Sequence, residues 1–315
     1  MTLLNKITDA INASPEDDKL YLIEKCSDIA GFFTCNKKLI YLVKNIEFVG
    51  SNSLQTEYLK LQSNANIISV ENFQNFDSGF YNLIEYRLPF TENLFVFESF
   101  INLCSAHIKL MNSKNFVEFF NSLIDLFQNE EKEKKQNVLG LFGELSIIYY
   151  FYTEFNLNLA PYWHTSGSYS KYDFSIRRLN MEVKTSSSLK NISIKHSQIF
   201  NDDQNYLAIA IVENNNSGIT LKDLELKLRS INTINTDFNF IMNLEVEKVR
   251  IKTVDYAERK FKLLDINIYD CNKINPVLQI SDSISNLEYK MDLIAFEKIN
   301  LIDVKTILKI GGEND

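Results

Sequence analysis

Three charged residues in the stretch 171–188, KYDFSIRRLNMEVKTSSS, have the types and spacing of a metal-dependent phosphodiesterase site. Asp173 is followed after eight intervening residues by Glu182, and Lys184 lies two residues further on. Two carboxylates can bind Mg²⁺ and leave positions for water, and the metal can polarise a phosphate and activate that water. A neighbouring lysine can orient the water or stabilise charge on phosphorus. The same residues would also suit the solvent-exposed face of an ordinary β-hairpin.

The alternation of polar and apolar residues in this stretch predicts such a hairpin. With a turn at residues 179–180, Ser175 lies opposite Lys184, and Asp173 lies diagonal to Lys184, roughly 7–8 Å away. One face of the hairpin then carries its polar and charged side chains, namely Asp173, Ser175, Arg177, Glu182 and Lys184. The hairpin is therefore the scaffold that would present a metal site.

Spacing alone does not single out this site, because the Glu-x-Lys pattern recurs along the chain. Further copies begin at positions 130, 133, 225, 258 and 288. The copy at Glu288 and Lys290 competes most directly, since it lies in a strand-like run and follows Asp282. The Glu182 copy lies in a basic segment, residues 161–200, with six Lys or Arg against two Asp or Glu. Such a segment suits a phosphate-rich partner, although a chance fluctuation in charge is the alternative.

The segment before the hairpin predicts a helix over about residues 136–155. Gly140 and Gly143 lie inside it, although glycine costs about 1 kcal/mol relative to alanine in a helix interior. Their spacing of three indicates that another backbone packs very close. Glu144 falls on the flank of the buried face, where a carboxylate needs a partner or a metal. It is the candidate third carboxylate.

The remaining patterns predict an α/β (mixed α+β) fold. The near-continuous apolar run 204–214 is typical of a strand buried on both faces. Other expected elements are a helical start over 1–30, strands over 31–45 with a turn near Asn36, a strand over 80–89, a helix over 113–128, a strand or short helix over 192–200, helices over 221–247, and strands over 262–270 and 287–296. We expect a mixed α/β N-terminal region (1–112), a nuclease core (113–220) and a C-terminal α/β extension (221–315).

The composition excludes several classes of protein. The 315 residues are 45% hydrophobic with only 9 Gly and 4 Pro, which excludes a disordered chain. The apolar runs are far shorter than the roughly 20 residues of a membrane helix, and the start lacks the features of a signal peptide, so we expect a cytoplasmic protein. A net charge of −8 argues against a dedicated DNA-coating protein. The four cysteines fit neither a zinc site nor a disulfide framework.

Several short motifs together resemble the PD-(D/E)XK nuclease superfamily. They are GLFGEL on a helix, a loop containing Trp163, YDF, MEVKTSSS and a later HSQ, spread over about residues 136–212. More narrowly, they are similar to the PD-(D/E)XK motif proteins that accompany methyltransferases and ATPases in bacterial restriction-like gene clusters. The resemblance implies a restriction-endonuclease-like core, a central mixed sheet flanked by helices, with metal bound at the hairpin.

The resemblance also implies roles for individual residues. The metal-binding aspartate of the superfamily falls on Asp173, its acidic partner on Glu182 and its lysine on Lys184, while the helical glutamate of many members falls on Glu144. The implied cofactor is Mg²⁺ or Mn²⁺. One departure is that Tyr172 stands where the superfamily name has proline.

Weaker candidates lie near the same site. Contacts to DNA are expected from Arg177, Thr185, Lys195 and Gln198, with hydrogen bonding at the protein surface as the alternative. We interpret Trp163 as a core anchor rather than a base-stacking residue.

The leading hypothesis is a Mg²⁺-dependent DNA endonuclease subunit of a prokaryotic restriction or anti-phage defence system. Its partners would be DNA and proteins of the same gene cluster, such as a methyltransferase and an ATPase, without a membrane, and a homodimer stays open. The alternative is a non-catalytic DNA-binding or scaffold subunit with a vestigial site. The intact Asp, Glu and Lys set argues against decay.

Overall fold

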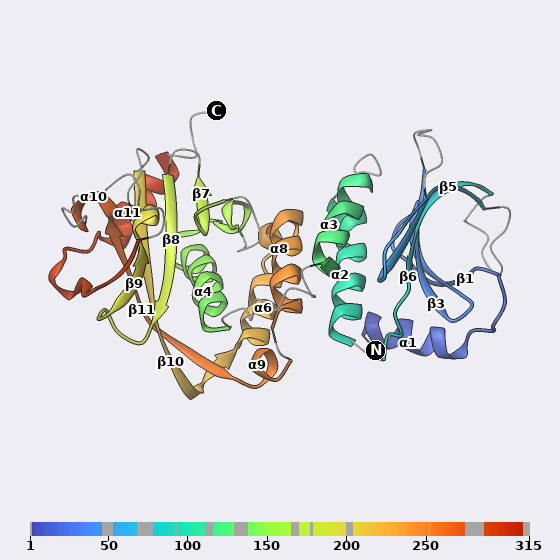
Figure 1. Cartoon of the computed structure of the whole chain (residues 1–315), viewed down its shortest axis with the longest axis horizontal. Helices are drawn as coiled ribbons and strands as arrows, with labels where there is room; N and C mark the ends of the chain where they lie inside the picture. The colour runs from blue at the N-terminus through green and yellow to red at the C-terminus, as the bar shows by residue number, and fades with distance from the viewer. Residues whose placement is uncertain are drawn as a thin grey trace. The chain divides into compact units, whose positions relative to one another are not determined.

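The computed structural model of the chain describes residues 2–45, 53–67, 78–91, 94–110, 116–128, 138–164, 170–176, 179–199, 204–251, 253–274 and 287–310. The chain divides into two compact units, residues 1–133 and 134–315, whose elements are labelled in Figure 1.

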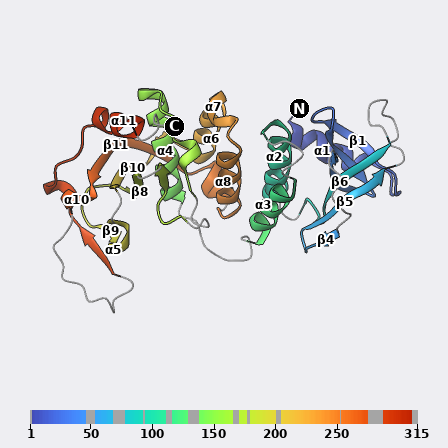
Figure 2. The same cartoon turned by 90° about the horizontal axis from the view of Figure 1, so that it is seen from above.

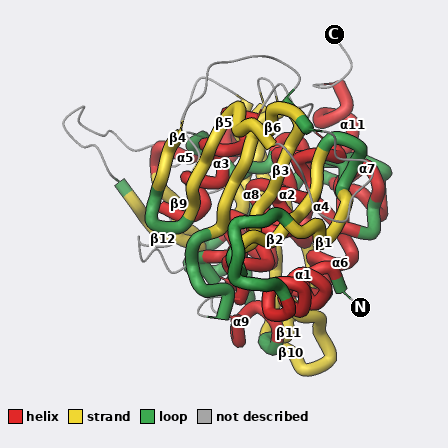
Figure 3. The backbone as a smooth tube through the Cα atoms, turned by 90° about the vertical axis from the view of Figure 1, so that its right-hand side faces the viewer, coloured by secondary structure: helices red, strands yellow, loops and turns green. Residues whose placement is uncertain are grey.

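The first unit is built on a six-stranded antiparallel sheet in the order β1-β2-β3-β6-β5-β4. Figure 3 shows β5, β6 and β3 running side by side. Its elements are α1 (Leu3–Ala13), β1 (Tyr21–Lys25), β2 (Ala30–Cys35), β3 (Lys38–Lys44), β4 (Ser53–Gln55), β5 (Leu59–Ile67), β6 (Gly79–Tyr86), α2 (Leu94–Leu110) and α3 (Phe116–Gln128).

Helices α2 and α3 share an aromatic core with this sheet. The Tyr41 hydroxyl on β3 lies 3.0 Å from Nδ1 of His107 on α2. The His107 ring stacks on Phe119 of α3 with ring centroids 4.1 Å apart. All three side chains are fully buried, so this layer of the unit is a packed core.

Two expectations for the first unit have different outcomes. The turn near Asn36 is confirmed, because Asn36 and Lys37 connect β2 to β3 with φ angles of 49° and 57°, as tight hairpin turns require. The helical interpretation of residues 21–23 is wrong, because α1 ends at Ala13 and these residues form β1. Pro15 lies two residues after the end of α1 and disfavours helical backbone at Ser14, the residue before it. The apolar residues 21–23 lie in β1, which pairs with β2.

The second unit is built on a mixed four-stranded sheet in the order β11-β10-β8-β7, which confirms the predicted fold class. The β8–β10 pair is parallel, and the pairs β7–β8 and β10–β11 are antiparallel. Its elements are α4 (Val138–Phe155), η2 (Ala160–Tyr162), β7 (Phe174–Ile176), β8 (Leu179–Ser186), β9 (Ile192–Lys195), α5 (His196–Ile199), β10 (Gln204–Thr220), α6 (Leu221–Arg229), α7 (Asn232–Asn235), α8 (Phe238–Val249), α9 (Thr253–Ala257), β11 (Lys260–Asp270), α10 (Cys271–Ile274), β12 (Glu288–Met291), η3 (Leu293–Ala295) and α11 (Leu301–Ile310).

Both faces of this sheet are covered, as Figures 1 and 2 show. Helix α4 packs against β8 and β10 on one face. On the other face, Leu207 and Ile209 of β10 join an apolar cluster with residues of β9, α5, α10 and η3. Strand β10 is therefore buried from both sides over its first half, as its continuous apolar run predicts.

Strand β11 returns to the same sheet after the helices α6 to α9. It pairs with β10 from Tyr206↔Asp270 to Thr220↔Lys260. Residues beyond 220 thus contribute a strand to the sheet that carries the hairpin, while the expected three-part division at 112/113 and 220/221 stays a prediction.

Two further expectations concern the cysteines and membrane-spanning helices. All four cysteines are free thiols. Among the described residues, no helix combines the length and apolar character needed to cross a membrane.

Candidate active site

The hairpin forms, but its register differs from the predicted one. Ser175 pairs with Asn180 and Ile176 with Leu179, so the turn is not at residues 179–180 and Ser175 does not face Lys184. The ladder leaves Arg177 and Arg178 between the strands, and both lie outside the described residues. Neither arginine is a residue type that marks a tight turn, which is why the sequence pattern placed the turn at the wrong residues. The ladder begins at Phe174, which pairs with Met181, so Asp173 lies just before the paired residues.

Strand β8 alternates between the two faces of the sheet. Thr185 lies against α4, where its hydroxyl is 3.4 Å from the Gly140 carbonyl. Glu182 and Lys184 therefore lie on the opposite face, where α5 packs. Lys184 Nζ donates to Glu182 Oε1 at 2.5 Å, and Gln198 Nε2 on α5 donates to the same oxygen at 2.5 Å.

Asp173 precedes β7 and is held by backbone groups on both sides. Its Oδ2 accepts a hydrogen bond from the Val183 N–H at 2.7 Å. Its own carbonyl accepts one from the His164 N–H at 2.8 Å. Tyr172, at the position of the missing proline, is buried and its hydroxyl accepts a hydrogen bond from Asn205 at 3.1 Å. The tyrosine thus fixes the backbone beside Asp173 by packing.

Glu144 reaches the site from α4. Because α4 covers the other face of the sheet, Glu144 approaches past β7, which is the edge strand. Its Oε2 accepts a hydrogen bond from Trp163 Nε1 at 2.8 Å. Trp163 is 1% exposed, so its interpretation as a core anchor is confirmed, and the indole N–H has a polar role that the sequence did not indicate.

Burial raises the pKa values of all three carboxyl groups, and the charges of neighbouring carboxylates raise those of Glu144 and Asp173 further. Burial, and then the charge of Asp173, raise the pKa of Glu144 well above its usual range. Burial, and then the charge of Glu182, raise the pKa of Asp173 to about 7. Burial also raises the pKa of Glu182, although Lys184 and Gln198 oppose that shift. Electrostatically the carboxylates form a row with Asp173 between Glu144 and Glu182.

Glu247 is a fourth carboxylate near this row, which sequence reasoning missed. It lies on α8 and is 1% exposed, and its Oε1 pairs with Arg250 at 2.8 Å. Its charge also raises the pKa values of Glu144 and Asp173. No motif marked Glu247, because its position beside the site depends on how α8 packs.

The chemistry of these side chains fits a divalent cation. In the described part of the chain, Asp173 Oδ1, Glu182 Oε2 and Glu144 Oε1 accept no hydrogen bond, while the other oxygen of each carboxylate is held. Hard carboxylate oxygens suit Mg²⁺ or Mn²⁺, and a cation would relieve the repulsion within the row. The described residues include no group of three His, Cys, Asp or Glu side chains already close enough to hold one ion. Asp173 and Glu182 are therefore the two main candidate ligands for a cation, and direct ligation by Glu144 stays a prediction.

A pH dependence of stability follows from the raised pKa of Asp173. The folded protein holds this proton up to about pH 7, whereas an unfolded aspartate releases it near pH 4. The folded state therefore binds more protons in this window, and its stability falls as the pH rises through it. We expect the free energy of unfolding of the metal-free protein to fall by about 1–4 kcal/mol between pH 5 and 8. Urea titrations would measure this loss.

Two variants and the cation make this measurement specific. Asp173→Asn should remove much of the pH dependence, Asp303→Asn at an exposed position should leave it unchanged, and Mg²⁺ should reduce it. A metal-free protein whose stability is the same at pH 5 and 8 would contradict the raised pKa.

The weaker candidates differ in their surroundings. Thr185 packs against α4, and Gln198 bonds Glu182 and also accepts from the Lys195 N–H at 3.3 Å. The Lys195 side chain is exposed, and its charge lowers the pKa of Glu182. Arg177 lies outside the described residues. Contacts of these residues with DNA stay predictions.

The competing Glu-x-Lys copy has another environment. Glu288 and Lys290 are exposed on β12, where Glu288 accepts a hydrogen bond from Ser193 of β9. Asp282 lies outside the described residues.

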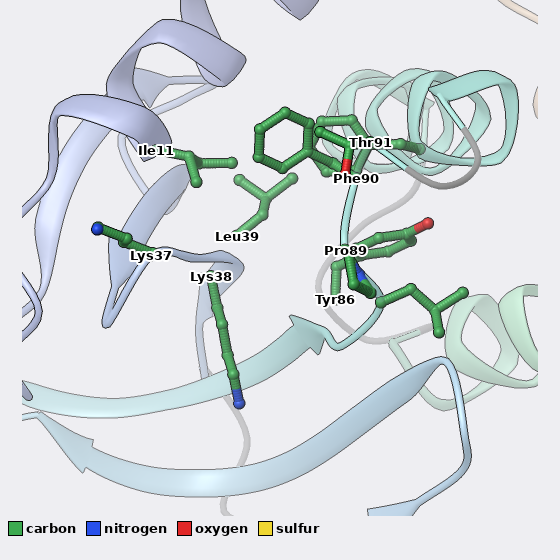
Figure 4. Close-up of a pocket in the computed structure, with 10 residues that line it drawn as sticks. Ile11, Lys37, Lys38, Leu39, Tyr86, Pro89, Phe90 and Thr91 are labelled. Carbon is green, nitrogen blue, oxygen red and sulfur yellow. The ribbon is translucent and has the colours of Figure 1, made fainter.

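Two cavities lie away from the carboxylates. One of about 210 Å³ is in the first unit, with Lys37 and Lys38 on one side and Phe90 and Thr91 on the other (Figure 4). The second, of about 330 Å³, lies between α4 and the β10–β11 pair. Neither is lined by Glu144, Asp173 or Glu182, so the candidate site is not defined by either cavity.

Comparison with known families identifies one match. The family model described as "Putative PD-(D/E)XK family member, (DUF4420)" matches residues 40–294, well over half of the chain. Comparison with curated proteins and with solved structures found no match.

Proposed function

Because the chain belongs to this PD-(D/E)XK family, we propose that it is a divalent-metal-dependent nuclease that hydrolyses DNA phosphodiester bonds. The family implies a restriction-endonuclease-like fold, and the mixed sheet of the second unit has helices on its faces in that manner. The observation that carries the proposal is that Asp173, bonded to the backbone of β8, lies close enough to Glu182 and Lys184 for their charges to act on it, while Lys184 bonds Glu182.

The chain's own residues support a specific division of labour. Asp173 and Glu182 would hold Mg²⁺ or Mn²⁺ through the oxygens that accept no described hydrogen bond. The bound cation supplies Lewis acidity and lowers the pKa of a water. Lys184 orients the attacking water or stabilises negative charge on the phosphate, while Gln198 keeps the Glu182 carboxylate in place. Glu144 adds a third carboxyl group on the α4 side of the site.

The cellular setting belongs to the same proposal. The family resemblance supports a subunit of a prokaryotic restriction or anti-phage defence system in the cytoplasm, acting with a methyltransferase and an ATPase. The net charge of −8 favours delivery to DNA by such partners over an independent search.

The alternative is a non-catalytic DNA-binding or scaffold subunit. One observation favours it, namely that the described residues include no three-ligand group in place for a cation. The retention of Lys184 in contact with Glu182 favours catalysis, because a scaffold has no need of this pair.

Removal of the metal separates these two functions. We expect the purified chain to nick or cut plasmid DNA with Mg²⁺ or Mn²⁺, and to lose that activity when EDTA is added, because Asp173 and Glu182 alone cannot activate water. Agarose-gel assays with and without the proteins encoded by neighbouring genes would measure it. DNA binding that EDTA leaves intact, without cleavage under any of these conditions, would favour the scaffold.

A further inference from the structure

Two consecutive residues of the loop after α4 contact Glu144 and Asp173, the first at its carboxylate and the second at its backbone carbonyl. Trp163 Nε1 donates to Glu144 Oε2 at 2.8 Å, and the His164 N–H donates to the Asp173 carbonyl at 2.8 Å. Trp163 also forms a β-bridge with Phe174, the first residue of β7. A shift of this loop would therefore displace Glu144 and Asp173 together.

Helix α8 holds this loop in place. Asn243 Nδ2 donates to the Trp163 carbonyl at 2.8 Å. The Phe240 ring packs on the indole with centroids 5.6 Å apart, and both Phe240 and Trp163 are buried. The backbone and the ring of Trp163 thus each have a partner on α8.

The position of α8 is fixed in turn by a buried network of ion pairs. Lys248 of α8 lies 3.1 Å from Glu225 of α6 and 3.2 Å from Glu245. Arg229 of α6 pairs with the same two glutamates. Removing one partner of a buried ion-pair network leaves the other charge buried and unpaired, which is strongly destabilising, so the network ties α8 to α6.

We propose that Trp163 is a positioning residue of the metal site and that α8 fixes it through Asn243. The inference rests on the proposed function. The indole N–H holds Glu144 Oε2, which leaves Oε1 as the oxygen available to a cation or its bound water. Such partners behind a metal ligand orient it, and their loss typically lowers metal affinity by about 10–100-fold. Part of the site then lies in residues 221–315, outside the segment that carries the sequence motifs.

Binding of Mn²⁺ to three variants tests the proposal. Trp163→Phe keeps a buried ring and removes the donor, and it should weaken Mn²⁺ binding about 10–100-fold and lower kcat more than it raises KM for DNA. Asn243→Ala should weaken Mn²⁺ binding in the same direction. The matched control is Asn239→Ala, because Asn239 is an exposed asparagine on the same helix α8, and this variant should bind Mn²⁺ like the unaltered chain. A folded Trp163→Phe chain with unchanged Mn²⁺ affinity would overturn the proposal.

A measurement without metal keeps the inference separate from the proposed function. Trp163 is the single tryptophan, so ultraviolet resonance Raman bands of the indole N–H report this one hydrogen bond. We expect the bands to shift toward a weaker bond in Glu144→Ala and in Asn243→Ala, and to stay in place in Asn239→Ala. If the unaltered chain binds no Mn²⁺, the proposed function fails, and the Raman result still decides the contact. Bands that Asn243→Ala leaves unchanged would overturn the role of α8.

Discussion

Replacing Lys184 by alanine is expected to lower Mg²⁺-dependent DNA cleavage by about 10²–10³-fold while the protein still binds the cation. Lys184 is not a candidate ligand, so Asp173 and Glu182 keep their oxygens for the metal. What is lost is the ammonium group, which lies 2.5 Å from Glu182 Oε1 and which, in the proposed function, would supply positive charge next to the phosphate. Initial rates of plasmid nicking and calorimetric Mn²⁺ titration would measure the two effects separately.

The competing Glu-x-Lys copy provides the control for this result. Lys290 lies in the same sequence pattern and is exposed on β12, so Lys290→Ala should cleave DNA at the unaltered rate. A chain that loses cleavage with Lys290→Ala and keeps it with Lys184→Ala would show that the wrong copy was chosen.

Gly143→Ala is expected to unfold the second unit in part or to destabilise it by about 1–3 kcal/mol. A Cβ added at Gly143 would lie 1.9 Å from Thr185 Oγ1 and 3.0 Å from Thr185 Cβ. Alanine favours helix by about 1 kcal/mol over glycine, so a net loss of stability must come from this collision. Glu144 is the next residue of α4 after Gly143, and β8 carries Glu182 and Lys184. A movement of α4 away from β8 that relieves the collision therefore also moves the carboxylates apart. Urea unfolding and Mn²⁺ affinity would both report the change.

A second substitution tests whether the collision is the cause. Thr185→Ala removes the nearest atom, so the Gly143→Ala/Thr185→Ala chain should regain much of the stability that Gly143→Ala loses. The control is Gly79→Ala in the first unit. A Cβ added at Gly79 would lie 3.9 Å from its nearest neighbour, Tyr81, so this variant should lose no stability through a collision. Additive losses in the double variant would contradict the packing argument.

The sequence predicted the elements whose signals are local. The paired glycines indicated a close approach of another backbone to the helix, and what Gly143 meets is the side chain of Thr185 on β8. The apolar run of residues 204–214 indicated a strand buried on both faces, which β10 is. The period-two alternation placed Glu182 and Lys184 on one face of β8, which holds although the register was wrong, because residues i and i+2 of one strand share a face whatever its pairing.

Features that depend on tertiary packing were not predictable in this way. The hairpin lacks glycine, asparagine or proline at residues 177–178, so no turn chemistry located its register. Nothing in the sequence indicates that the Trp163 N–H donates to Glu144. Glu247 lies near the site only because α8 packs beside it. The sequence also did not indicate that the side-chain amide of Gln198 bonds Glu182. These relations join segments far apart in the chain, which single-sequence patterns do not encode.

The contact between Trp163 and Glu144 also makes the protein its own optical probe. The chain has one tryptophan, so all indole fluorescence originates 2.8 Å from a candidate metal-site carboxylate, and none comes from the first unit. Changes in the charge or occupancy of the site should alter the emission of an unlabelled chain. A luminescent lanthanide such as Tb³⁺ would accept energy from the excited indole only at short range, so cation binding can be followed in the presence of DNA, partners and substrate without any engineered dye.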